Sequence, residues 1–596
     1  MKKTLVSILL LLAMMLNVLA LASCGGDGDG GATDTFLEPP KVEIPADGYD
    51  PEAKVTVTFY HTMGENLSTV LDKYILKFNE IYPNITIDHD QVGGYDDVRE
   101  TISTELAVGG GPNIAYCYPD HVALYRRANK VIALDDLIAS QASDGKGGII
   151  GMTEAEKENF IDGYWEEGYQ FDDGTKMYTL PFSKSTEVLY YNKTFFDEHN
   201  LTPPTTWDQM ETLLATIKQI DPTCIPLGYD SESNWFITMC EQYGSGYTSA
   251  TGEKFLFNND TNKAFIKRFN TWFQNGWVTT QEIFGAYTSG LFVAQGEGVQ
   301  KSYMSIGSSA GATHQRPVAG ADGTYPFEVG ITSIPQLTET STPKVISQGP
   351  SICVFDKGND QQTIAAWLFV KYLTTSVEFQ ADFSIASGYV PVLESVMDIP
   401  AYDEFINGAK GYSNFTVNAQ GKVVSDFTRL ADLAEDALSV YTYDETAGTL
   451  SITVGEETAV LNVEKTEGAD TVKLYIVEGD AKQYLTGAVD KGQYVFSANA
   501  DEAGAFHLEA CEGGHRFYKI TGGADGGAYI AALSAKVCLE QAEAYYTSPA
   551  FVGSSAARDE VGVLLRKCIS YEGTDLDAYI DKAFKDAINS CKYMAR

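Results

Sequence analysis

One short segment of the chain has the residue types and spacing of a reactive or ligand-binding turn. Gly307-Ser308-Ser309-Ala310-Gly311 matches G-x-S-x-G, the nucleophile elbow of α/β-hydrolases, with Ser309 in the position of the nucleophile. The same turn also offers backbone N–H groups and two hydroxyls that can hold a sugar hydroxyl or a phosphate. Gly307, Ser308 and Ser309 are therefore candidate ligand-binding residues, and a serine hydrolase that uses Ser309 is a minor alternative.

The surroundings of this turn favour binding over catalysis. A nucleophile elbow needs a helix directly after the serine, whereas residues 312–320 contain an Arg-Pro pair and a flanking glycine. The downstream histidines are His314, His507 and His515, and the last two belong to a segment of different character. The sequence has no H-E-x-x-H, no P-loop and no G-x-G-x-x-G between a strand and a helix. We expect no enzymatic activity, no cofactor, no catalytic residue and no metal site.

The composition excludes several functional classes. The 596 residues include 81 acidic and 42 basic side chains, a formal net charge of −39, and such a charge repels nucleic acid and anionic membrane surfaces. Hydrophobic residues make up 44% of the chain, which allows large buried cores and argues against global disorder. Acidic pairs such as Glu166-Glu167 and Asp172-Asp173 are the expected background in so acidic a chain and do not indicate a glycosidase.

The N-terminus has the features of an export signal. Two lysines precede an apolar run over residues 5–21, and a Leu-Ala-Ser sequence leads into Cys24. Small residues directly before a cysteine resemble the lipobox of bacterial lipoproteins, in which the cysteine is diacylated and begins the mature chain. We expect a signal peptide over 1–23, lipidation at Cys24, a flexible tether over 24–52 and a position at the outer face of the bacterial cell membrane. An ordinary secretory signal is the alternative.

The other eight cysteines contain no C-x-x-C pair and are too few for a disulfide framework in a chain of this length. We expect them to be mainly small buried hydrophobic residues, and the sequence assigns no disulfide pairing.

Hydrophobic periodicity predicts an α/β fold over the first 400 residues. Strands and helices alternate as in a parallel sheet with helices on its faces. The predicted elements include strands at 55–59, 85–87, 113–117 and 188–191 and helices at 67–81, 98–106, 206–217 and 364–372. Ligands of such sheets bind beyond the carboxyl ends of the strands. The loops to consider are 60–64, 118–121, 183–187 and 307–309.

The residue pattern of the sequence changes between about residues 412 and 530. Short β-branched segments such as Thr449–Val454 and Val472–Val477 are separated by Gly/Glu/Asp turns. Helical periodicity returns at 531–546 and continues to the C-terminus. We therefore expect a small all-β module inserted into a helical region, with its two ends close together.

Six motifs follow one another in a characteristic order. They are Gly109-Gly110-Gly111-Pro112-Asn113, Leu180-Pro181-Phe182, Val188-Leu189-Tyr190-Tyr191-Asn192-Lys193, Pro203-Pro204-Thr205-Thr206-Trp207, Ser387-Gly388-Tyr389-Val390-Pro391 and Ser548-Pro549-Ala550-Phe551. Behind a lipobox, this order resembles the extracellular solute-binding proteins of carbohydrate-type ABC importers, which are related to maltose-binding and glycerol-phosphate-binding proteins. The resemblance covers roughly 53–406 and 531–596 and does not explain the β module.

The resemblance implies a two-lobed, periplasmic-binding-protein-like α/β fold whose lobes close on a hinge around the ligand. Together with the inserted all-β module it predicts the domain organisation. Lobe 1 takes residues 53–182 and 309–352, lobe 2 takes 187–306, 353–411 and 531–596, and the β-rich module takes 412–530.

The family position of several residues implies a role in binding a sugar, whose hydroxyls and C–H faces require polar side chains and aromatic platforms. Trp235 is the expected stacking platform, with a buried core tryptophan as the alternative. Structural roles are the alternatives for His61 and for Asp120, which can cap a helix. The implied ligand-binding residues are Tyr60, His61, Tyr118, Asp120, Ser185, Trp235, Gln348 and Tyr389, with Glu187 less favoured, in addition to the 307–309 turn.

The function implied by the resemblance is that of a monomeric, lipid-anchored substrate-binding protein of an ABC importer. It would capture a small polar solute, preferably a mono- or oligosaccharide, and deliver it to the permease subunits. Glycerol phosphate or another polyol phosphate is the alternative ligand, which the acidic composition disfavours. A surface glycan-adhesion lipoprotein that uses the β module is the alternative from a different class.

Overall fold

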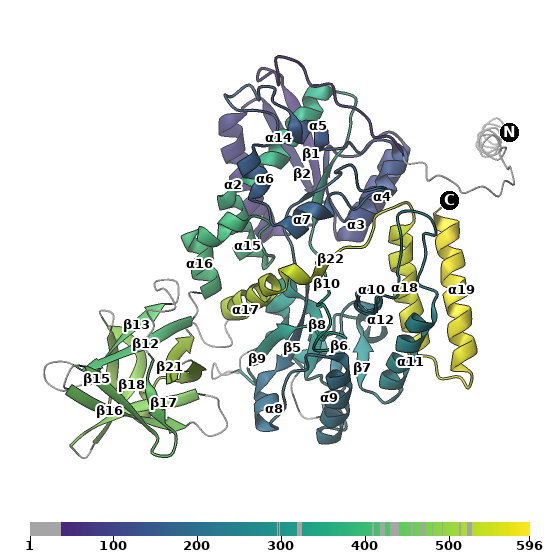
Figure 1. Ribbon diagram of the computed structural model, residues 1–596. Coiled ribbons are helices and arrows are strands. Elements are labelled where there is room, and N and C mark those ends of the chain that lie inside the picture. Colours follow the sequence, from purple (N-terminus) through teal and green to yellow (C-terminus); the bar gives the residue numbers. More distant parts are fainter. Residues whose placement is uncertain are drawn as a thin grey trace, which may run out of the picture. The chain divides into compact units, whose positions relative to one another are not determined.

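The computed structural model describes residues 37–595 apart from short gaps at 295, 297, 319–324, 408–409, 418–422, 430–439, 455–456, 466–470, 480, 491–492, 512–513 and 521–526. The predicted signal peptide, Cys24 and the first part of the predicted tether lie outside the described residues. The described chain forms two α/β lobes, each on its own five-stranded sheet, and a third, all-β sheet (Figure 1).

The first lobe is built on a mixed sheet. In spatial order its strands are β2 (Ile85–Gln91), β1 (Val55–His61), β3 (Ile114–Cys117), β11 (Ser351–Val354) and β4 (Leu180–Pro181). As predicted, β1 runs parallel to β2 and β3, whereas β11 is antiparallel to β3 and β4. The helices of this part of the chain are α2 (Glu65–Ile81), α3 (Tyr95–Ala107), α4 (Pro119–Tyr125), α5 (Asp135–Ala139), α6 (Glu154–Glu158), α7 (Asp162–Glu167), α14 (Asp360–Thr375), α15 (Val377–Ser387) and α16 (Pro400–Asn407).

The second lobe has a sheet of the same size. Its strands, in spatial order, are β7 (Val278–Thr280), β6 (Leu227–Tyr229), β8 (Met304–Ser308), β5 (Glu187–Asn192) and β9 (Val329–Ser333). Its helices are α8 (Lys193–Glu198), α9 (Trp207–Ile220), α10 (Glu232–Tyr243), α11 (Asp260–Gln274), α12 (Gln281–Phe284), α13 (Ser289–Phe292), the 3-10 helix η2 (Ser309–Gln315), α18 (Ser554–Ile569) and α19 (Leu576–Met594). The predicted capping box of Thr206 and Gln209 opens α9, and α18 and α19 pack side by side (Figure 1).

The predicted lobe boundaries differ from the structure after residue 309. The segment 309–352 was expected in lobe 1, but β9 pairs along β5 in the second sheet. The segment 353–411 was expected in lobe 2, but the helices α14 and α15 bury Trp367 and Phe379 in the core of the first lobe. The reason is that the chain crosses back to the first lobe at β11, which completes the first sheet between β3 and β4.

Three chain segments connect the lobes. The first joins β4 to β5, the second contains β10 (Val345–Ile346) and the third contains β22 (Tyr545–Tyr546), which pairs in parallel with β10. Ser185 and Gln348 exchange backbone hydrogen bonds of 2.9 and 2.8 Å between the first two segments. The helix α17 (Gly527–Glu540) precedes β22 and contributes Cys538 to the core of the first lobe and Val537 to a cluster of the second.

Residues 37–52 are packed on the first lobe and do not form the free tether that we expected. Tyr49 is 2% exposed in the core of that lobe, and its backbone N–H donates to the Ser143 carbonyl at 2.8 Å. Gly48 has a φ of +90°, and a Cβ there would lie 2.0 Å from the same carbonyl oxygen, so this contact requires glycine.

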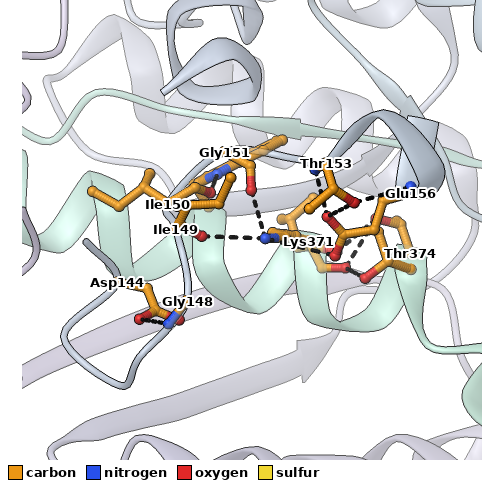
Figure 2. Close-up of polar contacts among 12 residues, drawn as sticks. Asp144, Gly148, Ile149, Ile150, Gly151, Thr153, Glu156, Lys371 and Thr374 are labelled. Atoms are coloured by element: carbon orange, nitrogen blue, oxygen red, sulfur yellow. Dashed lines mark hydrogen bonds and ion pairs between the residues drawn. The ribbon is translucent and has the colours of Figure 1, made fainter. Parts of the chain in front are cut away.

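Hydrogen bonds hold the loop between α5 and α6 of the first lobe against α14 (Figure 2). The Lys371 ammonium donates to the carbonyls of Ile149 and Gly151 at 3.2 and 2.5 Å and lies 3.6 Å from the Glu156 carboxylate. The Trp367 indole N–H donates to the Ile150 carbonyl at 2.8 Å. These contacts satisfy backbone carbonyls that regular secondary structure would otherwise have to pair.

The inserted β module agrees closely with its predicted bounds. Its strands are β12 (Lys410–Val417), β13 (Val423–Arg429), β14 (Thr442–Asp444), β15 (Thr449–Val454), β16 (Glu457–Lys465), β17 (Thr471–Glu478), β18 (Ala481–Asp490), β19 (Gln493–Ser497), β20 (Phe506–Cys511) and β21 (Gly514–Ile520). The first and last of them pair antiparallel, with Tyr412 opposite Tyr518. The module therefore leaves the rest of the chain and returns to it at neighbouring points.

Seven of the cysteines are free and buried: Cys117, Cys224, Cys240, Cys353, Cys538, Cys568 and Cys591. This confirms their predicted role as small hydrophobic residues. In the part of the chain that the structure describes, no helix has both the length and the apolar character needed to cross a bilayer.

Candidate functional site

A cavity of about 580 Å³ lies between the two lobes. The first lobe lines it with Tyr95, Tyr118 and Tyr389, and the second lobe lines it from the starts of α10, α12 and α13 and from η2. The Ser185 and Gln348 side chains of two connecting segments complete the wall. The volume is within the range of small-molecule sites. We refer to this cavity as the cleft.

Tyrosine rings form one side of the cleft. Tyr95 is the first residue of α3, and Tyr118 directly follows β3, so both side chains sit at the carboxyl-end edge of the first sheet. Their ring centroids are 4.7 Å apart. The Tyr95 hydroxyl lies 3.4 Å from that of Tyr389, which follows α15, and burial raises the pKa of all three phenols. Tyr287 lines the opposite side and is 65% exposed.

The turn at the end of β8 faces these rings. Gly307 and Ser308 line the cleft, and the Ser308 hydroxyl donates to that of Ser185 at 3.4 Å. A Cβ at position 307 would lie 2.8 Å from the Asp230 carboxylate, so glycine permits this close approach. The Asp230 carboxylate accepts hydrogen bonds from the Thr288 backbone N–H and hydroxyl at 2.6 and 2.7 Å, while burial raises its pKa.

A second carboxyl group is buried in the wall at the start of β5. Glu187 accepts a hydrogen bond from the Tyr229 hydroxyl at 2.7 Å and another from the Asn234 amide at 3.0 Å. The Arg558 guanidinium of α18 donates to the Asn234 carbonyl oxygen. Burial raises the pKa of Glu187 to about 7, against the lowering effect of these hydrogen bonds and of Arg558.

A smaller hollow of about 130 Å³ adjoins the cleft. Tyr118, Gln348 and Arg558 line both. Asp120 and Tyr247 line the smaller hollow alone, and there one Asp120 oxygen and the Tyr247 hydroxyl are buried without a hydrogen-bond partner. Buried polar atoms of this kind usually meet a ligand or water.

The structure brings most of the predicted ligand-binding residues together. Tyr118, Ser185, Gly307, Ser308, Gln348 and Tyr389 line the cleft, and Asp120 lines the adjoining hollow. Asp120 lies in the first turn of α4 but makes no capping hydrogen bond. Tyr118, Asp120, Ser185 and the 307–308 turn lie in loops that the sequence placed at strand ends, where an open α/β sheet exposes its ligand-binding side, whereas Gln348 and Tyr389 were implied by the family resemblance.

Two aromatic residues predicted as ligand contacts lie in hydrophobic cores. Trp235 is fully buried in the second lobe, stacked on Tyr229 at 5.0 Å, because the apolar face of α10 turns toward the core. His61 is fully buried as well and bonds to His89 at 2.8 Å and to the Met63 backbone N–H at 3.1 Å. Neither is among the residues that line the cleft, and both positions agree with the alternatives of a core tryptophan and a structural histidine.

Two other predicted ligand-binding residues, Tyr60 and Ser309, make structural contacts within the protein. The Tyr60 ring packs beside a core cluster of the first lobe, with its hydroxyl 3.5 Å from Glu105. Ser309 is 1% exposed, and its hydroxyl accepts a hydrogen bond from the Thr186 backbone N–H at 3.2 Å. A helical turn does follow Ser309, contrary to our expectation, but this hydroxyl holds a connecting segment and is not presented to the cleft as a nucleophile would be.

Sequence reasoning missed several residues of the site: Tyr95, Asp230, Asn234, Tyr287 and Arg558. Two of them could have been predicted from the sequence: Asp230 directly follows β6, and Asn234 lies in the first turn of α10 next to Trp235. Such positions between a strand and a helix often bind ligands in α/β sheets. Arg558 lies beyond the inserted module and no local pattern marks it, because only the tertiary fold brings α18 to the cleft.

The arrangement suits the binding of a polar solute. It combines aromatic rings, hydroxyls, one guanidinium and carboxyl groups that already accept protein hydrogen bonds. Such a site can orient a polar solute through many directed contacts.

Comparison with known proteins agrees with this geometry. Residues 73–410, more than half of the chain, match the family model described as bacterial extracellular solute-binding protein. The sn-glycerol-3-phosphate-binding periplasmic protein UgpB of Escherichia coli (strain K12) is 22% identical over 393 residues, which cover 63% of this chain and 83% of that protein.

Two solved structures have a similar fold at low sequence identity. The cyclic alpha-maltosyl-1,6-maltose binding protein from Arthrobacter globiformis aligns with a TM-score of 0.53 and 15% identity, over 91% of this chain and 99% of the other. The sugar-binding protein MalE from Xanthomonas citri aligns with a TM-score of 0.55 and 13% identity, over 90% and 98%.

Proposed function

The chain belongs to the bacterial extracellular solute-binding proteins, and from this premise we propose that it captures a mono- or oligosaccharide in the cleft and delivers it to the permease of an ABC importer. The observation that carries the proposal is the cleft itself, in which tyrosine rings face hydroxyl, amide and carboxyl groups. A sugar presents C–H faces to aromatic rings and hydroxyls to polar side chains, so its chemistry complements these walls.

The charges of the cleft favour a neutral solute. Glu187 and Asp230 contribute carboxyl groups, and Arg558 contributes the guanidinium. A phosphate would gain from Arg558 but would be repelled by the carboxylates whenever they are ionised. Glycerol phosphate or another polyol phosphate is the second candidate, which is supported by Arg558, by the adjacent serine turn and by the name of the Escherichia coli relative.

Solute capture would proceed by closure of the two lobes on the connecting segments. A solute that contacts both walls binds the closed state more tightly and so shifts the population toward it. In the closed state Tyr118 of the first lobe and Ser308 of the second would contact one solute, and the permease would recognise that state. Small-angle scattering with a saturating sugar should show compaction, and an unchanged radius of gyration would contradict this step.

A lipid anchor on Cys24 would hold the protein at the outer face of the cell membrane. The support is the Leu-Ala-Ser-Cys sequence behind an apolar run. In cells fed a labelled fatty acid, the wild-type protein should carry the label and Cys24→Ser should not. Label retained by the variant would contradict the anchor.

A thermal-shift screen followed by calorimetry tests the ligand class. The panel should contain mono- and oligosaccharides, polyols, glycerol phosphate and glycerophosphodiesters, because a saturating ligand raises stability by RT ln(1 + [L]/Kd). For the sugar with the largest shift, Tyr118→Ala should weaken binding by about 10- to 100-fold, whereas Tyr118→Phe, which keeps the ring, should lose far less. A panel in which phosphates alone raise the melting temperature would favour the second candidate.

A further inference from the structure

Glu187 is connected to Arg558 through a single amide. The Asn234 side chain donates its N–H to the Glu187 carboxylate at 3.0 Å and accepts the Arg558 guanidinium on its carbonyl oxygen. Tyr229 donates to the other carboxylate oxygen at 2.7 Å. Because the Asn234 amide bonds to both groups at once, the orientation of Arg558 is linked to the carboxylate behind it.

The carboxylate also sets the charge of the cleft wall. With Glu187 ionised, its negative charge offsets the positive charge of Arg558, and the Coulomb attraction between the two groups is reflected in the lowering effect of Arg558 on the pKa of Glu187. With Glu187 protonated, that compensation is lost and the wall gains positive character. An anionic solute gains from this change, and a neutral solute does not.

We propose that Glu187 is a positioning and specificity-determining residue, which orients Arg558 through Asn234 and offsets its charge so that the cleft selects neutral hydroxylated solutes over phosphate-bearing ones. The inference rests on the proposed function, since it presupposes that the cleft binds a sugar. It assigns to Glu187 an effect on the ratio of the affinity for a phosphate-bearing solute to the affinity for a neutral sugar. A purely structural role would not change this ratio.

The selectivity should depend on pH in a stated direction. Burial raises the pKa of Glu187 to about 7, so lowering the pH from 8 to 6 protonates it and should favour anionic solutes. The groups that face it are Tyr229 and Asp230 at the end of β6, Arg558 of α18 and Tyr546 of β22. His314 of η2 lines the same cleft, so the variant below is needed to assign the effect to Glu187.

The experiment compares two probes on the full-length mature protein by calorimetry between pH 6 and pH 8. The neutral probe is maltose, or the sugar with the largest thermal shift. The anionic probe is glycerophosphoglycerol, a phosphodiester that keeps one negative charge throughout this range, so its own titration does not contribute. The variant is Glu187→Gln, whose amide can accept from Asn234 and donate to Tyr229. Glu166→Gln, which removes the same charge at an exposed position, is the matched control.

The proposal expects the wild-type ratio of phosphodiester to sugar affinity to rise about tenfold from pH 8 to pH 6. Glu187→Gln should show the raised ratio at both pH values, and Glu166→Gln should behave as wild type. A wild-type ratio independent of pH, or a variant ratio equal to wild type at pH 8, would overturn the inference while leaving sugar binding intact. If the wild type binds no sugar of the panel, the proposed function itself fails and this inference fails with it.

Discussion

At the scale of single residues, burial separates the aromatic side chains that bind from those that fold. Trp235 of α10 and Tyr118, which follows β3, were both candidate ligand-binding residues, yet Trp235 is fully buried between Tyr229 and Phe269 whereas Tyr118 lines the cleft. The face of its element on which the side chain lies decides between the two roles, and residue type does not.

Replacing Trp235 should therefore affect stability and not specificity. Trp235→Ala should lower the free energy of unfolding by about 3–5 kcal/mol, because it leaves a cavity in the core of the second lobe. Urea unfolding at constant pH measures this loss, with Tyr118→Ala as the comparison, for which a much smaller loss is expected. A stable Trp235→Ala protein with strongly reduced sugar affinity would reinstate Trp235 as the platform.

Glu187 should make the solute-free protein less stable at high pH. Its folded-state pKa of about 7 lies above the unfolded value of 4.5, so its contribution is fully present below pH 4.5 and is lost as the pH rises through 7. The difference amounts to about 3 kcal/mol at pH 8. Glu187→Gln should accordingly be more stable than wild type at pH 8 and equal to it near pH 4, as measured by the urea midpoint without solute. Equal midpoints at both pH values would contradict this assignment.

At the scale of elements, the connecting segments carry a buried ion pair. The Lys184 ammonium, fully buried in the first segment, bonds to the Glu167 carboxylate at the end of α7. Ser347 of the second segment and Ser351 at the start of β11 donate to the same carboxylate at 3.1 and 2.9 Å. One carboxylate thus joins two connecting segments and fixes their relative register.

Replacing one partner of this ion pair should lower the free energy of unfolding more than replacing both partners. Lys184→Met leaves Glu167 buried without its cation and should lower the free energy of unfolding by about 3–5 kcal/mol. The double variant Lys184→Met/Glu167→Gln should recover much of that loss, because no uncompensated charge is left. Guanidinium unfolding of both variants gives the comparison. Single and double variants of equal stability would show that the charge pair is not the source of the loss.

At the scale of the whole molecule, the β module joins the solute-binding lobes through one pair of strands. Because Tyr412 and Tyr518 are opposite each other in β12 and β21, their Cα atoms lie about 5 Å apart. A short Gly-Ser linker can therefore replace residues 413–517 without displacing either end.

Removal of the module should leave solute binding intact. We expect the shortened protein to bind its sugar with a Kd within about twofold of the full chain, because the described residues that line the cleft all lie outside the module. Calorimetry on the two proteins measures this, and a parallel polysaccharide pull-down tests the adhesion alternative. Retained sugar binding contradicts a function that resides in the module, whereas loss of both activities with an intact fold would support one.

Local patterns in the sequence predicted much of this fold. The alternating elements up to β3, the capping box of α9, the limits of the β module and the buried cysteines all follow from periodicity, turn residues and hydrophobicity. Loops at strand ends also predicted part of the cleft wall, namely Tyr118, Ser185, Gly307 and Ser308. These features depend on residues that are only a few positions apart in the chain, so they can be predicted without knowledge of any long-range contact.

The tertiary structure alone decided which lobe each segment after residue 309 joins and which candidate side chains face the cleft. Strand pairing places β9 in the second sheet and β11 in the first. Trp235 and His61 are buried because each lies on the face of its element that packs against the interior of its lobe. The contact of Arg558 with Asn234 spans 324 residues and the inserted module. No local pattern encodes such pairings, because they are settled by how complete hydrophobic faces and sheet edges fit together.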